Sequence, residues 1–253
     1  MSGLDELSKR LEALREASQR VCRRLLKTRS DIVAIMVVGS VARGNIHENS
    51  DADLCVLVKY GEHPERERIR ELDCDVEVVY TPLRLWRERL YRGIGSMWEI
   101  DVSNVVDSLV LYDPYGVVRE IKRMFKVYPE EKRRMNILEI FHRMGWYEEA
   151  VRYHYLKKNY DVQSVFSKMY VMEALKILFT LNRVYLRGEK HMFEQLKELR
   201  EIPPGLLEKC LSLLWFKSRG VKYEEATWIL ETVSDIWRLI KDKIRSSEPG
   251  LVR

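Results

Sequence analysis

Two aspartates, Asp51 and Asp53, lie two residues apart and alternate with apolar residues in the segment DADLCV, residues 51–56. Because successive side chains of a β-strand point to opposite faces, this alternation predicts a strand with both carboxylates on one face. Two neighbouring carboxylates are costly unless a cation lies between them. Oxygen ligands suit Mg²⁺, which in turn binds the phosphates of nucleotides. The pattern therefore predicts a magnesium site that holds a nucleoside triphosphate.

A possible phosphate-binding turn precedes the two aspartates. The apolar run of residues 32–38 ends at Gly39 and Ser40, and residues 41–50 connect this turn to the acidic pair. A residue without a Cβ lets a phosphate approach the backbone, and the Ser40 hydroxyl and N–H can donate hydrogen bonds to it. The guanidinium of Arg43 could bind the same phosphates. The alternative is an ordinary turn between a strand and a helix.

The succession of an apolar residue, Gly39, Ser40, a loop of about ten residues and Asp51-Ala52-Asp53 resembles the signature of the polymerase-beta-like nucleotidyltransferase superfamily. This resemblance implies two Mg²⁺ ions, attack on the α-phosphorus of a nucleoside triphosphate, and transfer of a nucleoside monophosphate with release of pyrophosphate. ATP or another nucleoside triphosphate is the expected co-substrate.

The superfamily has a third metal-binding carboxylate on a following strand. Residues 74–80 offer Asp75 and Glu77, which lie two residues apart and hence on one face. We assign the role to Glu77, because valines enclose it within the strand whereas Asp75 lies at the strand entrance. The expected metal ligands are therefore Asp51, Asp53 and Glu77.

Further segments resemble the aminoglycoside (kanamycin-type) nucleotidyltransferases. They are VEVVY (76–80), SLVLYDPYGVVREIKRMF (108–125) and EIPPGLLEKC (201–210). Glu120 falls near the position of the general base in that subfamily, and the alternative is an exposed helix residue. The resemblance also implies a homodimer whose protomers share the active-site cleft, with the helical half of the chain binding the acceptor.

Hydrophobic periodicity predicts a mixed α/β half followed by a helical half. Together with the resemblance this implies an α/β (α+β) chain: a small mixed nucleotidyltransferase sheet flanked by helices, followed by a helical-bundle C-terminal domain. A boundary near Tyr128-Pro129 gives a catalytic domain, 1–128, and a helical acceptor-binding or dimerisation domain, 129–253. Strands are expected at 32–38, 51–59, 75–80 and 108–112. Helices are expected at 1–28, 64–72, 83–92, 117–128, 129–158, 162–187, 192–199, 205–216 and 223–244.

The composition fits an enzyme with an anionic ligand. The 253 residues are 46% hydrophobic and carry a formal net charge of +5, too small an excess to require a nucleic-acid duplex. The four cysteines show neither close pairing nor the spacing of Cys and His metal ligands. A disulfide framework is therefore not expected, which fits a reducing, cytoplasmic location. No segment reads as a signal peptide or a membrane span.

Three functions are consistent with these features. The first is a Mg²⁺-dependent nucleotidyltransferase that adds AMP from ATP to a hydroxyl of a small molecule. The second modifies a protein tyrosine or an RNA end, as in toxin–antitoxin pairs. The third is a catalytically inactive nucleotide-binding regulator.

Overall fold

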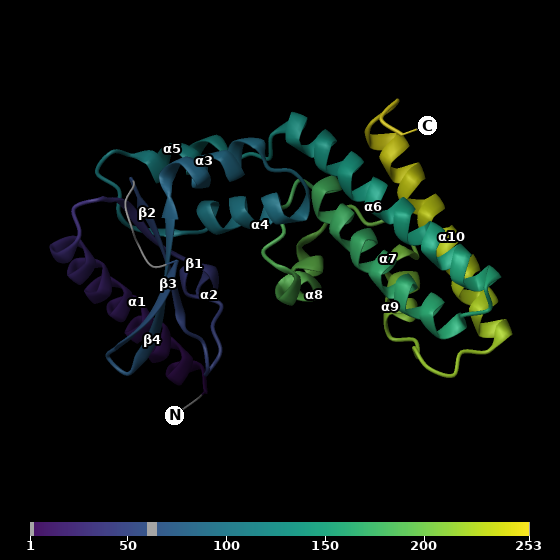
Figure 1. Ribbon diagram of the computed structural model, residues 1–253, viewed down its shortest axis with the longest axis horizontal. Helices are drawn as coiled ribbons and strands as arrows, with labels where there is room; N and C mark the ends of the chain where they lie inside the picture. The colour runs from purple at the N-terminus through teal and green to yellow at the C-terminus, as the bar shows by residue number, and fades with distance from the viewer. Residues whose placement is uncertain (1–2, 60–64, 253) are drawn as a thin grey trace. The chain divides into compact units, whose positions relative to one another are not determined.

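The computed structural model describes residues 3–59 and 65–252 (Figure 1). The chain divides into two compact units. The first contains the described residues up to Gly93 together with Ile100–Val127, and the second contains Ile94–Glu99 and the chain from Tyr128 onward.

The first unit is built on a mixed sheet with the strand order β3-β4-β2-β1-β5. Strands β2 and β4 pair in parallel, and the other neighbouring strands pair antiparallel. The strands are β1 (Ile32–Val38), β2 (Ala52–Val58), β3 (Arg66–Glu71), β4 (Cys74–Pro82) and β5 (Leu109–Tyr112).

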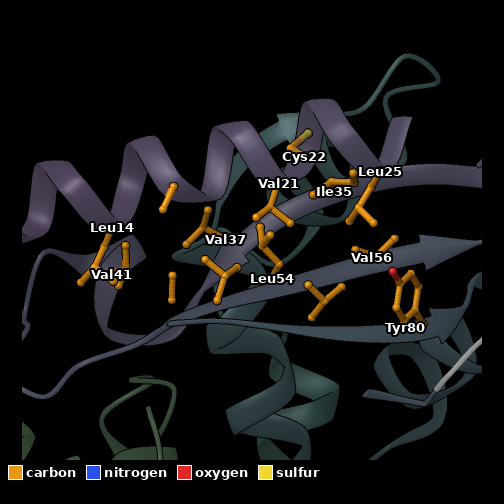
Figure 2. Close-up of a cluster of buried hydrophobic side chains, with 14 of the residues drawn as sticks. Leu14, Val21, Cys22, Leu25, Ile35, Val37, Val41, Leu54, Val56 and Tyr80 are labelled. Atoms are coloured by element: carbon orange, nitrogen blue, oxygen red, sulfur yellow. The ribbon is translucent and has the colours of Figure 1, made fainter. Parts of the chain in front are cut away.

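The long helix α1 (Gly3–Thr28) packs across one face of this sheet. Figure 2 shows Leu14, Val21 and Leu25 of α1 pointing toward the sheet, with Leu14 near Val41 and Leu25 near Val56. In β2, the buried residues Ala52, Leu54 and Val56 belong to this cluster, and Asp53 and Cys55 alternate with them on the other face. Burial against α1 therefore fixes which face carries the aspartates.

Strand β3 corrects one prediction. A helix was expected over 64–72, but residues 66–71 (RERIRE) form an edge strand antiparallel to β4; Pro64 lies outside the described residues. The arginines alternate with Glu67, Ile69 and Glu71, which is the period of a strand. Ile69 packs against the hydrophobic core, and this burial accounts for the observed conformation.

Short helices complete the first unit: α2 (Gly39–Arg43), α3 (Leu83–Arg92) and α5 (Val117–Met124). Helix α5 begins after the turn that follows β5, where Asp113 is buried. The Asp113 carboxylate accepts hydrogen bonds from the backbone N–H groups of Val117 (2.8 Å) and Arg119 (3.0 Å). This aspartate satisfies donors that the first turn of a helix otherwise leaves free.

The second unit is helical in its described residues. Helix α7 packs against α6, α9 and α10, and its buried residues lie all around its axis. The helices of the second unit are α6 (Glu130–Leu156), α7 (Tyr160–Leu181), α8 (Met192–Gln195), α9 (Leu206–Leu214) and α10 (Tyr223–Ser247), with the 3₁₀ turns η1 (Glu189–His191) and η2 (Leu196–Glu198).

A buried carboxylate lies within this second unit. Glu99 is fully buried in α4 (Gly95–Val106), a helix that spans the boundary between the units. Its Oε1 accepts hydrogen bonds from Tyr128 (2.5 Å) and Thr180 (2.6 Å), and Asn136 donates to the Tyr128 hydroxyl (2.7 Å). Burial raises the pKa of Glu99 to about 7, because these hydrogen bonds offset only part of the desolvation.

The predicted α+β class is confirmed: a mixed sheet with flanking helices is followed by a helical region. Three helical details differ from expectation. Helix α4 was not predicted, and α7 ends at Leu181 rather than near residue 187 because Arg183 adopts a φ of 56°. The stretch 192–199 consists of short turns instead of one helix.

Candidate active site

Asp53 of β2 and Glu77 of β4 are register partners in the parallel strand pair. Partners in register point to the same face of a sheet, and neighbouring strands lie about 4.8 Å apart. Asp51 directly precedes β2 and lies within 3.8 Å of Arg68, which is itself the register partner of Glu77. Asp53 and Glu77 thus lie side by side on the face opposite α1, and Asp51 lies directly before the same strand as Asp53.

Gly39 lies directly beside Asp53. Its φ is +70°, and a Cβ at this position would stand 2.8 Å from Oδ2 of Asp53. A side chain here would therefore displace the carboxylate or strain the backbone. The turn that was predicted to bind phosphates therefore requires glycine for the close approach of the Asp53 carboxylate, and its role in phosphate binding stays a prediction.

The other two residues of the predicted phosphate-binding set lie in α2. Ser40 is half-buried at the first turn, where its carbonyl accepts a hydrogen bond from the N–H of Asn45 (3.0 Å). Arg43 is largely buried, with its side chain 12% exposed, and its Nη1 lies 3.9 Å from Oδ2 of Asp107. Arg43 would have to leave this ion pair to reach a phosphate.

Arginines of β3 contact the carboxylates, which sequence reasoning did not anticipate. Arg66 pairs with Glu77 (3.2 Å) and Arg68 pairs with Asp51 (3.8 Å). The third arginine of the strand, Arg70, pairs with Asp75 (3.1 Å). The signal was present in the sequence, because arginine at every second position of RERIRE is the pattern of one strand face.

The carboxylates suit a magnesium ion in their chemistry, because Mg²⁺ prefers oxygen ligands. Among the described residues no three His, Cys, Asp or Glu side chains are already arranged around a metal position. The contacts that Asp51 and Glu77 make instead are to arginine side chains that are 63% and 64% exposed. The side chains of Glu77 and Asp51 are 17% and 42% exposed. An ion pair to a largely exposed arginine contributes little, so a divalent cation can compete with the two guanidiniums. The donor set fits Mg²⁺, with Asp51, Asp53 and Glu77 as its holders.

Cys55 lies on the same strand face as Asp53, two residues further along β2. Burial raises the pKa of the Cys55 thiol to about 12, so this thiol is protonated at neutral pH. A covalent intermediate on Cys55 is therefore disfavoured.

Glu120, the candidate general base, lies on α5 and is exposed. Asp113 orients the start of this helix through its backbone hydrogen bonds. Both residues belong to the unit that carries the carboxylates. The role of Glu120 as the general base stays a prediction.

Comparisons with known proteins agree with this geometry. Residues 14–96 match the nucleotidyltransferase domain family, and residues 96–192 match a domain of unknown function (DUF4037). The solved structure of a nucleotidyltransferase-like protein from Exiguobacterium sibiricum is similar, with a TM-score of 0.61 and 12% identity. The similarity covers 91% of this chain and 77% of that one. No curated protein matches the chain.

The match at residues 14–96 includes the Gly39-Ser40 turn and all three carboxylates. It confirms the superfamily that the sequence motif predicted, whereas the closer likeness to the kanamycin-type enzymes stays a prediction. Within the described residues, no helix has the length and apolar character needed to cross a membrane.

Proposed function

We propose that this protein transfers a nucleoside monophosphate to an acceptor hydroxyl and releases pyrophosphate. The proposal is supported by the match of residues 14–96 to the nucleotidyltransferase domain family. The donor is ATP and the acceptor is a small molecule. The observation that carries the proposal is the register pairing of Asp53 with Glu77. The Asp53 carboxylate of this pair lies beside the glycine turn at Gly39.

In the proposed reaction the acceptor oxygen attacks the α-phosphorus, and the bond from that phosphorus to the pyrophosphate oxygen breaks. Bound Mg²⁺ supplies positive charge that stabilises the phosphates and acidifies the hydroxyl. The turn at Gly39 and Ser40 holds the donor phosphates. Asp51, Asp53 and Glu77 hold the metal ions, and Glu120 accepts the proton of the acceptor hydroxyl.

The resemblance to the aminoglycoside nucleotidyltransferases supports two further parts of the proposal. The chain forms a homodimer, and its helical unit contributes to acceptor binding. Light scattering of the purified protein measures the mass in solution, and the mass of a single chain would contradict the dimer. We also propose a cytoplasmic location, with which four free cysteines are compatible.

The direct test is incubation with ATP labelled at the α-phosphate, Mg²⁺ and a pool of cellular metabolites. We expect a labelled product and an equal amount of pyrophosphate from the wild type, and neither from Asp53→Asn. Asp75→Asn is the matched control, since Asp75 lies on the same strand face as Glu77 but outside the proposed metal set. No turnover with any nucleoside triphosphate would contradict the proposal, and label on a protein or RNA would identify the alternative acceptors.

A further inference from the structure

The phosphate-binding turn and the β3 arginines lie on opposite sides of the carboxylates. Across the sheet, Gly39 follows β1, Asp53 lies on β2, Glu77 on β4 and Arg68 on β3, in the order of the strands themselves. If the donor triphosphate occupies the turn at Gly39, the space beside β3 is left for the acceptor. This assignment of sides rests on the proposed function.

We propose that the acceptor is a small molecule that carries a phosphate group, and that Arg66 and Arg68 bind this phosphate. Arginine presents a planar fork of donors that matches phosphate oxygens in a bidentate manner. Each of the two guanidiniums already contacts a carboxylate of the metal set, so both lie next to the reacting centre.

Binding of metal ions prepares these arginines for an anion. In the protein without metal, Asp51 and Glu77 neutralise Arg68 and Arg66. Once the carboxylates hold Mg²⁺, they no longer balance the guanidiniums, and two positive charges with exposed side chains become available. Phosphate binding at β3 should therefore be stronger in the presence of Mg²⁺ and the donor.

The neighbouring charges favour a single phosphate over a polynucleotide. Arg70, the next arginine along the strand face, is held by Asp75. Exposed Asp73 and Glu65 lie beyond the two ends of this face. A nucleic-acid strand running along β3 would meet these carboxylates, whereas one phosphate between Arg66 and Arg68 would not. A polycationic acceptor is disfavoured by the same two guanidiniums.

The test uses the whole protein saturated with Mg²⁺ and a nonhydrolysable ATP analogue, so that the donor phosphates are already in place. Inorganic phosphate is then titrated in a calorimeter, followed by ribose and ribose 5-phosphate as a matched pair. The variants are Arg66→Gln/Arg68→Gln and the control Arg70→Gln, whose side chain is equally exposed on the same strand face. Circular dichroism verifies that each variant is folded.

We expect wild-type protein to bind inorganic phosphate, and to bind ribose 5-phosphate in preference to ribose. The double variant should weaken phosphate binding about tenfold or more, as for the loss of charge-assisted hydrogen bonds. The Kd of Arg70→Gln for inorganic phosphate should stay within about twofold of the wild-type value. Omission of Mg²⁺ should weaken phosphate binding by the wild type but not by the double variant.

Equal phosphate binding by the double variant and the wild type would overturn the inference, as would no binding to the loaded wild type. In both cases binding of the ATP analogue leaves the proposed function intact. Failure of the analogue itself to bind would overturn the proposed function and this inference with it. A short single-stranded RNA that binds through Arg66 and Arg68 more tightly than the small phosphates would show that the acceptor is a nucleic acid.

Discussion

Gly39 and Asp53 come so close that a Cβ on the glycine would stand 2.8 Å from the Oδ2 atom of the carboxylate. Gly39 is the first residue of α2, directly after β1, and its neighbour Val38 is the register partner of Asp53 on β2. The contact couples the conformation of Gly39 to the position of a proposed metal ligand. Changes at Gly39 should therefore be visible both in stability and in catalysis.

We expect Gly39→Ala to destabilise the protein by about 1–2 kcal/mol, because alanine is strained at a φ of +70°. Displacement of the Asp53 carboxylate should also lower nucleotide transfer by roughly tenfold or more. Gly205→Ala is the control for strain alone, since Gly205 has a φ of +75° and nothing within 4 Å of the added Cβ. Urea unfolding and a pyrophosphate-release assay separate the two effects, and equal activity of both variants would contradict the coupling.

Glu120→Gln tests the assignment of the general base. Loss of a positioned base should lower kcat by about 10²–10⁴-fold with little change in the KM for ATP. Because Glu120 is exposed and its helix is fixed by other residues, the fold should be unaffected. A kcat within about twofold of the wild type would show that Glu120 is an ordinary surface residue of α5.

Asp113→Ala should destabilise the protein by about 1–2 kcal/mol, because the N–H groups of Val117 and Arg119 lose their acceptor. Asp113→Asn keeps one carbonyl oxygen and should cost less. Thermal unfolding in the absence of ligand measures the difference. An alanine variant as stable as the wild type would indicate that water replaces the carboxylate at this helix start.

Glu99→Gln should change the pH dependence of stability. The pKa of Glu99 is raised from 4.5 to about 7, so between these pH values the unfolded chain has lost a proton that the folded protein keeps. Wild-type stability relative to Glu99→Gln should thus fall by about 3 kcal/mol as the pH rises from 4.5 to 7, and level off above 7. Urea unfolding of both proteins at several pH values gives this difference, and a difference independent of pH would contradict the raised pKa.

The strand face of Asp51 and Asp53 was predictable because it depends only on residues that are adjacent in the sequence. Alternation with apolar residues placed Asp51 and Asp53 on one strand face, and the turn at Gly39 precedes them in the sequence. The superfamily followed from these neighbouring residues, whereas the α+β class followed from the hydrophobic pattern along the whole chain; both are confirmed. The metal role of the carboxylates stays a prediction.

Features that depend on distant segments were not predictable in the same way. The arginines of β3 meet Glu77 and Asp51 only because β3 pairs with β4 in a particular register. A charged six-residue segment has too few apolar residues to distinguish a strand from a helix, and β3 was mistaken for a helix for this reason. The burial of Glu99 likewise depends on Tyr128 and Thr180, which lie far from it in the sequence.

The most direct test is a crystal structure of the protein with Mn²⁺ in place of Mg²⁺ and a nonhydrolysable ATP analogue, with anomalous scattering locating the metal. We expect manganese between Asp51, Asp53 and Glu77, with the analogue's phosphates beside Gly39 and Ser40. Manganese bound elsewhere, or an analogue bound without any of the three carboxylates coordinating metal, would contradict the proposed active site.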